Sequence, residues 1–159
     1  MRLVFASHNE GKIKEMRELL ADLPIQVVSA EEAGVLTEIV EDQETFEGNA
    51  LKKARVVSEA TQSWAIGDDS GISIDALGGA PGVYSARWAG EGKSGDDLVA
   101  HTLEQLKGIP LEKRSATFIT VLALVSPKEE SWTFHGEVKG LIAEQARGVL
   151  EEHLPYRVI

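Results

Sequence analysis

The chain has 159 residues, which is long enough for one domain with a substantial core. It contains no cysteine, so disulfide bonds and zinc–thiolate sites are excluded, and the composition fits a reducing compartment. The formal net charge of −10 argues against general affinity for nucleic acid or for an anionic membrane. Its apolar runs are too short for a signal peptide or a membrane span, so we expect a cytoplasmic protein with no nucleic-acid polymer and no membrane among its partners.

The amino-terminal residues predict a strand, a polar loop and a helix. Residues 2–6 are apolar, residues 7–12 read Ser-His-Asn-Glu-Gly-Lys, and apolar residues then recur at helical spacing until Pro24. A polar loop that enters a helix offers backbone N–H groups and the positive end of the helix dipole to an anion. Lys12 adds a positive charge there, which the dipole disfavours unless an anion lies nearby. Lys12 is therefore a candidate anion-binding residue, with a solvated lysine beside Glu15 as the alternative.

An acidic segment, residues 31–44, includes Glu41 and precedes a second predicted helix. Thr45 is the expected N-cap of this helix, and apolar residues follow it at helical spacing. Asn49 and Lys53 lie one turn apart on the helix and can face the same way. Charged residues on a helix usually form a solvated face, and this ordinary explanation applies less well to Asn49 and Lys53 than to their neighbours.

Residues 64–71 read Trp-Ala-Ile-Gly-Asp-Asp-Ser-Gly, an apolar run followed by Asp68 and Asp69. We expect a strand that ends at these two acids, where the side chains still reach solvent, and further strand residues at 72–74. Adjacent residues of a strand point to opposite faces, so only one of the two acids can serve a given pocket. Two interpretations are open. The stretch is either a polar turn, or a divalent-cation or general-base site, because carboxylate oxygens suit Mg²⁺.

Scaffold elements account for much of the remaining chain. Residues 25–29 predict a strand, and Ser94 with Asp97 forms a capping box that opens a helix. Residues 116–125 are rich in β-branched side chains, and residues 132–139 alternate between apolar and polar, so together they predict a long antiparallel hairpin.

Four motifs follow one another along the chain: Ser-His-Asn-x-x-Lys-x-x-Glu, Thr-Phe-x-x-Asn-Ala-x-x-Lys-Ala, Asp-Asp-Ser-Gly and Leu-Gly-Gly-x-Pro-Gly-x-Tyr-Ser-Ala-Arg. Each motif is weak alone, but in this order and at these separations the chain resembles the noncanonical purine nucleoside triphosphate pyrophosphatases, the inosine/xanthosine triphosphate pyrophosphatase family. The resemblance implies an α/β fold, with a long twisted mixed sheet flanked by helices and two lobes with a cleft between them. It also implies a cytoplasmic homodimer that hydrolyses ITP, dITP and XTP to the monophosphate and pyrophosphate with Mg²⁺, a house-cleaning activity.

The resemblance also implies roles for individual residues. Glu41 and Asp69 would hold the metal, and Asp69 would also act as the catalytic base. The polar loop would bind the triphosphate, while an amide and a lysine of the second helix would support the phosphate and metal region. The substrate-binding residues implied in this way are Ser7, His8, Asn9, Glu10, Gly11, Lys12, Asn49, Lys53, Ser70 and Tyr156.

The chain departs from the family pattern near its carboxyl end. The family continues with Gly-Phe-Gly-Tyr-Asp-Pro and with later motifs that grip the base. Here the Phe-Gly pair is replaced by residues 153–155, Arg157 stands where the family has aspartate, and the later motifs are absent. We therefore expect a single domain over residues 1–159 that is shortened relative to the family. An alternative function is a nucleotide-binding protein with little or no catalysis, because the base-recognition segment is missing.

Overall fold

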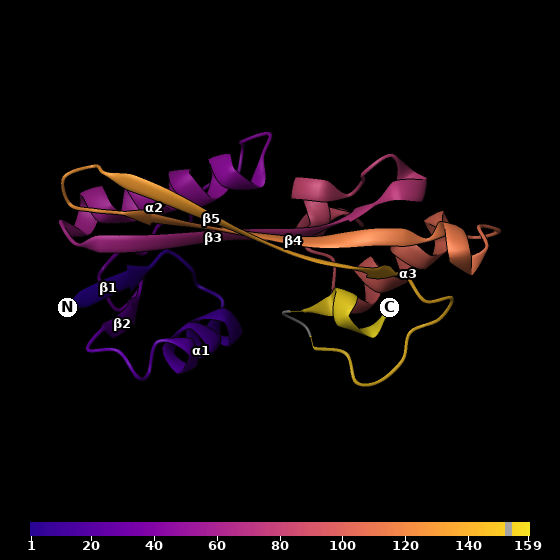
Figure 1. Cartoon of the computed structure of the whole chain (residues 1–159), viewed down its shortest axis with the longest axis horizontal. Coiled ribbons are helices and arrows are strands. Elements are labelled where there is room, and N and C mark those ends of the chain that lie inside the picture. The colour runs from indigo at the N-terminus through magenta and orange to yellow at the C-terminus, as the bar shows by residue number, and fades with distance from the viewer. Residues whose placement is uncertain (152–153) are drawn as a thin grey trace. The chain divides into compact units, whose positions relative to one another are not determined.

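The computed structural model describes residues 1–151 and 154–159. Position 153, which belongs to the segment that departs from the family motif, lies outside the described residues. Figure 1 shows the strands and α-helices in chain order. They are β1 (Arg2–Phe5), α1 (Glu10–Leu19), β2 (Gln26–Ser29), α2 (Phe46–Thr61), β3 (Trp64–Ile74), α3 (Gly95–Gln105), β4 (Ser115–Val125) and β5 (Ser131–Leu141). Short 3₁₀ turns are η1 (Asp75–Leu77), η2 (Gly82–Arg87), η3 (Leu111–Lys113) and η4 (Pro155–Val158). No helix in the described ranges is both long and apolar enough to cross a membrane.

The five strands form one mixed sheet in the order β2-β1-β3-β4-β5. β1 runs parallel to both of its neighbours, with Leu3 opposite Val27 of β2 and opposite Trp64 of β3. Parallel neighbours need long crossover connections, and α1 and α2 lie within these connections. The predicted α/β class, with a mixed sheet flanked by helices, is confirmed.

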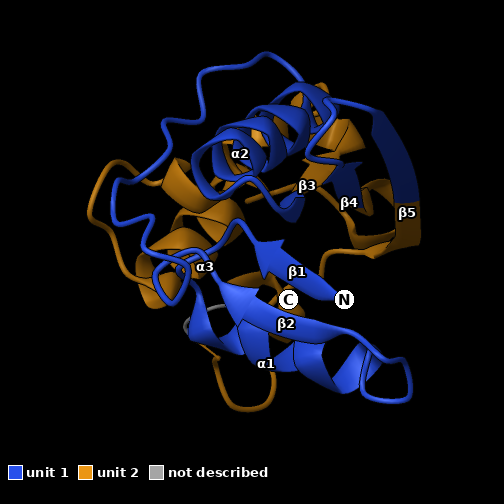
Figure 2. Cartoon of the chain, turned by 90° about the vertical axis from the view of Figure 1, so that its left-hand side faces the viewer, with its two compact units in different colours: residues 1–69, 120–135 blue, residues 70–119, 136–159 orange. Residues whose placement is uncertain are grey.

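The chain divides into two compact units, which Figure 2 shows in different colours. The first unit comprises Met1–Asp69 and Thr120–His135, and the second comprises Ser70–Ile119 and Gly136–Ile159. Strands β3, β4 and β5 contribute residues to both units. That residues 1–159 make one domain stays a prediction.

Within the first unit, α1 and α2 cover opposite faces of the parallel strands (Figures 1 and 2). This arrangement follows from the alternation of side chains along a strand. Leu3 and Phe5 of β1 pack with the buried residues of α1, whereas Val4 between them packs with Val57 of α2. The two apolar faces of one short strand therefore anchor both helices.

A glycine brings α2 unusually close to β3. A Cβ atom added to Gly67 would lie 2.3 Å from the carbonyl oxygen of Ala50 and 2.9 Å from the backbone nitrogen of Ala54, both in α2. Only a residue without a side chain permits this approach. The helix backbone consequently lies against the strand immediately before its two acids.

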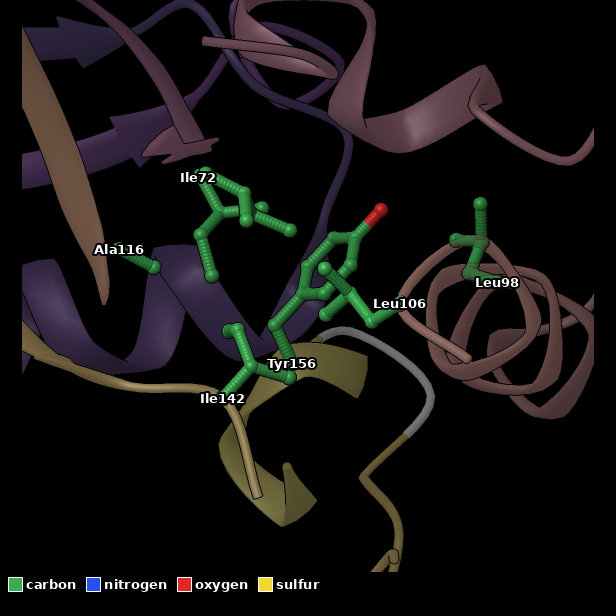
Figure 3. Packing of buried hydrophobic residues seen from close by; sticks show 7 residues of the cluster. Ile72, Leu98, Leu106, Ala116, Ile142 and Tyr156 are labelled. Atoms are coloured by element: carbon green, nitrogen blue, oxygen red, sulfur yellow. The ribbon is translucent and has the colours of Figure 1, made fainter. Parts of the chain in front are cut away.

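The second unit has its own core, shown in Figure 3. Its buried residues include Ile72 and Ile74 of β3, Leu98 of α3 and Tyr156 of η4. The capping box that opens α3 is present: the Ser94 hydroxyl accepts the N–H of Asp97, and the Asp97 carboxylate accepts the N–H of Ser94. This prediction is confirmed.

Strand boundaries differ from the sequence expectations at one important place. β3 runs without a break from Trp64 to Ile74, so the predicted end at Asp68 and Asp69 is wrong, and so is the polar-turn interpretation. The strand continues because both acids have partners in the first unit, described below, that compensate for their burial. The predicted hairpin matches β4 and β5, which are neighbours in the sheet and are joined by a turn in which the Ser126 N–H donates to the Glu130 carbonyl at 2.9 Å.

Candidate functional site

Asp68 and Asp69 lie in the interior of β3 and are each only 5% exposed. The expectation that such acids stay partly open to solvent is therefore wrong. A buried carboxylate is costly unless other groups neutralise it or donate hydrogen bonds to it. As adjacent strand residues the two acids point to opposite faces, and their partners come from different helices.

Asp68 pairs with Lys12 in the first turn of α1. The Lys12 side chain is 28% exposed, so it lies between the buried carboxylate and the surface. Side-chain hydrogen bonds within residues 7–12 fix the conformation of the loop before α1. The Asn9 side chain caps α1 by accepting the Lys12 N–H at 3.1 Å, and the Ser7 hydroxyl accepts the Asn9 N–H at 3.2 Å. Asp68 therefore provides the negative charge that we expected beside a lysine in the first turn of a helix.

Asp69 accepts a hydrogen bond from Asn49 of α2, with 2.9 Å between Nδ2 and Oδ2. Asn49 is fully buried, and its Oδ1 accepts the backbone N–H of Gln43 at 3.0 Å. The close approach at Gly67 places the first turns of α2 beside this part of β3. One amide therefore connects the carboxylate of Asp69 to the acidic segment that precedes α2.

That acidic segment is attached to α2 at further points, and we call residues 41–43 the acidic strap. Lys53 forms an ion pair with Glu41 at 2.6 Å, and the Lys53 residue is only 9% exposed. Lys52 forms a second ion pair with Asp42 at 2.7 Å, nearer the surface. Glu41 is thereby held next to the helix that also carries the partner of Asp69.

The structure brings the sequence-predicted site residues together in two groups. Asp69 and Glu41 are connected through Asn49, Lys53 and the strap, while Lys12 joins Asp68. The cleft between two lobes that the family resemblance implies stays a prediction. Of the other predicted residues, His8 and Glu10 are exposed, Gly11 is half-buried in α1, and Ser70 is half-buried in β3.

Tyr156 lies in the core of the second unit, where it is 8% exposed (Figure 3). Its hydroxyl donates to the backbone carbonyl of Ser85 at 2.8 Å. Burial of the phenol raises the pKa of Tyr156 to about 12, because the phenolate would lose its hydration there. These contacts give Tyr156 a structural role, and its assignment to substrate binding stays a prediction.

The donor set suits a metal ion that binds together with a phosphorylated ligand. Across residues 1–151 and 154–159, no group of three or more His, Cys, Asp or Glu side chains could hold a metal ion by itself. Glu41 and Asp69 offer hard oxygen donors, and Mg²⁺ is usually held by one or two carboxylates, with water and phosphate oxygens completing its coordination. The residues present therefore fit Mg²⁺ better than they fit a metal that needs a closed protein cage.

Sequence reasoning gave no role to Asp68, Gly67 or Gln43. Asp68 was visible as the neighbour of Asp69, and Gly67 stood inside an apolar run, where a glycine often marks a close backbone approach. Gln43 gave no signal, because it contributes through its backbone N–H.

A model of the Ham1 family matches residues 3–152 of the chain. The dITP/XTP pyrophosphatase of Bacillus subtilis (strain 168) is 48% identical over 145 residues, covering 91% of this chain and 73% of that protein. The protein of that name from Geobacter sulfurreducens is 45% identical over 147 residues, covering 92% and 74%. The solved structure of a HAM1 protein from Coxiella burnetii aligns with a TM-score of 0.85 at 38% identity, covering 93% of this chain and 76% of the other. The Staphylococcus aureus Ham1 protein aligns with a TM-score of 0.82 at 35% identity, covering 93% and 75%.

Proposed function

The chain belongs to the Ham1 family, and on that premise we propose that it is a nucleoside triphosphate pyrophosphohydrolase. Its substrates are the noncanonical purine nucleotides dITP, XTP and ITP, which it converts to the monophosphate and pyrophosphate with Mg²⁺. The observation that carries this proposal is the pair of adjacent buried acids in β3, each held by a polar side chain from a different helix. Buried, fixed carboxylates of this kind are costly for stability, and their role in catalysis explains that cost.

In this proposal, the loop of residues 7–12 binds the phosphates. Asn9 fixes the start of α1, where the helix dipole favours an anion. Lys12 then offers a cation that Asp68 holds in one direction, and a triphosphate approaching from solvent meets a positioned ammonium group. Because the ammonium group is already held in place before the substrate arrives, less conformational entropy is lost on binding.

Asp69 is the general base of the proposed reaction. It orients a water molecule and accepts its proton as the water oxygen attacks the α-phosphorus, and the bond from that phosphorus to the bridging oxygen of pyrophosphate breaks. Glu41 and Asp69 would hold Mg²⁺, which neutralises negative charge on the phosphates when it is bound. Lys53 lies beside Glu41 and adds positive charge to the same region.

Pyrophosphate release from ITP, XTP, dITP and ATP, measured side by side with Mg²⁺ and again with chelator, tests the proposal. We expect rapid release from the first three nucleotides, slow release from ATP, and none with chelator. Equal rates for ATP and ITP would contradict the assigned substrate class. No release from any nucleotide would contradict the enzymatic assignment.

Thermal unfolding separates the enzyme from the alternative of a nucleotide-binding protein without catalysis. A ligand that binds only the folded state at a hundred times its Kd stabilises it by about 2.7 kcal/mol. A rise in Tm with ITP and no pyrophosphate would support the binding protein, whereas no rise in Tm together with no pyrophosphate would contradict both. A homodimer and a cytoplasmic location belong to the same proposal, and light scattering of the purified chain tests the first of them.

A further inference from the structure

Asn49 is fully buried, and both ends of its side-chain amide are already used. A side chain with no exposed surface does not touch a nucleotide that arrives from solvent. We propose that Asn49 is a positioning residue: its amide clamps Asp69 and the acidic strap in one fixed arrangement. This inference rests on the proposed function and changes the role of Asn49 from substrate contact to alignment of the catalytic base.

Three consecutive strap residues meet three residues of α2, in reverse order. Glu41 pairs with Lys53 and Asp42 pairs with Lys52, while the backbone N–H of Gln43 donates to Asn49. The helix residues at these positions lie on neighbouring turns of one helix face. The strap therefore follows α2 in a defined register, which also sets the position of Glu41.

The three attachments are not equivalent. The Lys52 and Asp42 side chains are 30% and 54% exposed, and exposed ion pairs contribute little to stability. The Asn49 side chain has no exposed surface and its hydrogen bond to Asp69 is buried, whereas its bond to the Gln43 N–H is part-buried, so losing the bond to Asp69 costs more than losing an exposed ion pair. The Lys53–Glu41 pair is also partly buried, with side chains 11% and 29% exposed, but it joins the strap to α2, whereas the Asn49 amide contacts Asp69 itself, so the alignment of Asp69 depends on the amide.

The two hydrogen-bond partners of the Asn49 side chain together require an amide group at position 49. The backbone N–H of Gln43 can only donate, so it needs an oxygen acceptor at position 49. Ionised Asp69 can only accept, so it needs a donor from the same side chain. Aspartate has the shape of asparagine and keeps the acceptor, but it removes the donor. The substitution Asn49→Asp therefore breaks one half of the clamp and spares the other.

Two substitutions at position 49 test the hydrogen bonds of Asn49 to Gln43 and to Asp69 separately. A third substitution, elsewhere on α2, shows what a loss of stability alone does to activity. In Asn49→Ala we expect the Gln43 amide proton to exchange about tenfold faster than in the wild type, measured by NMR without metal or nucleotide. In Asn49→Asp we expect wild-type exchange at Gln43 but a kcat about a hundredfold lower, with KM for ITP nearly unchanged. Ser58→Ala is the control. The buried Ser58 hydroxyl donates to the backbone carbonyls of Ser63 and Ser126, so this variant loses stability while keeping kcat.

Three results would overturn the inference: unchanged Gln43 exchange in Asn49→Ala, a wild-type kcat in Asn49→Asp, or an equal loss of kcat in Ser58→Ala. If the position 49 variants do not fold, exchange in the wild type decides. A protected Gln43 amide supports the clamp, and exchange at the rate of an unfolded chain contradicts it. If wild-type protein releases no pyrophosphate, the proposed function fails by itself, and the exchange experiment still tests the clamp.

Discussion

Replacing Gly67 with alanine places a methyl carbon 2.3 Å from the carbonyl oxygen of Ala50 and 2.9 Å from the nitrogen of Ala54. Carbon and oxygen atoms that approach closely in proteins stay about 3.3 Å apart or more, so the first contact is about 1 Å too short. Both atoms belong to the backbone of α2, and no side-chain rotation can relieve the overlap. The helix must therefore move away from β3, or the strand must bend.

We expect Gly67→Ala to lower the free energy of unfolding by about 3 kcal/mol, the upper end for an overpacked core. Asn49 and Lys53 move with α2, and a misplacement of about 1 Å near a catalytic group can lower the rate a hundredfold. Urea denaturation followed by circular dichroism measures the first effect, and pyrophosphate release from ITP measures the second.

Gly140→Ala in β5 is the matched control. A Cβ at Gly140 would have no heavy atom within 4 Å beyond Gly140 and its two neighbours in the chain. Alanine is also less flexible than glycine in the unfolded chain, so this variant should be neutral or slightly stabilising. If Gly67→Ala unfolds within about 0.5 kcal/mol of the wild type and keeps its rate, the close approach of α2 does not position the site.

Three further predictions concern single side chains. Asp69→Asn should lower turnover by about 10²-fold to 10⁴-fold while circular dichroism stays unchanged, and near-normal turnover would remove Asp69 from the mechanism. Asp68→Asn leaves Lys12 without its charged partner, so urea denaturation should show a loss of about 1.5–3 kcal/mol, and KM for ITP should rise; unchanged values would mean that the pair positions nothing. Because burial holds the pKa of Tyr156 at about 12, above the ordinary 10.0, the unfolded chain ionises first. The free energy of unfolding of the wild-type protein should therefore be constant below pH 10 and fall by up to about 2 kcal/mol towards pH 12. In Tyr156→Phe, denaturation curves measured across this pH range should not show that fall.

Local features of the fold were predictable from the sequence. The N-cap at Thr45, whose side chain accepts the Gly48 N–H at 3.0 Å, and the capping box at Ser94 depend on residues three positions apart. Their chemistry is complete within a short window, so the residue types alone identify them. The α/β class likewise follows from motifs that the family shares.

The course of β3 through its two acids was not predictable in this way. Read locally, Asp-Asp-Ser-Gly is typical of a turn. The groups that stabilise the acids inside the strand are distant in sequence: Lys12 lies 56 positions from Asp68, and Asn49 lies 20 positions from Asp69. Tertiary contacts here override local preference, and single-sequence patterns do not contain them.

Adjacent acids with partners on opposite faces also constrain how this protein can evolve. Deleting or inserting one residue between Trp64 and Gly67 would turn Asp69 towards α1 and Asp68 towards α2, exchanging their partners. In the turn after β4, residues 127–130 are exposed, and the turn meets α2 through a hydrogen bond from the Ser58 hydroxyl to the backbone carbonyl of Ser126. Changes of chain length should therefore accumulate at that turn during divergence, while the spacing before the two acids remains fixed even where the surrounding residues change.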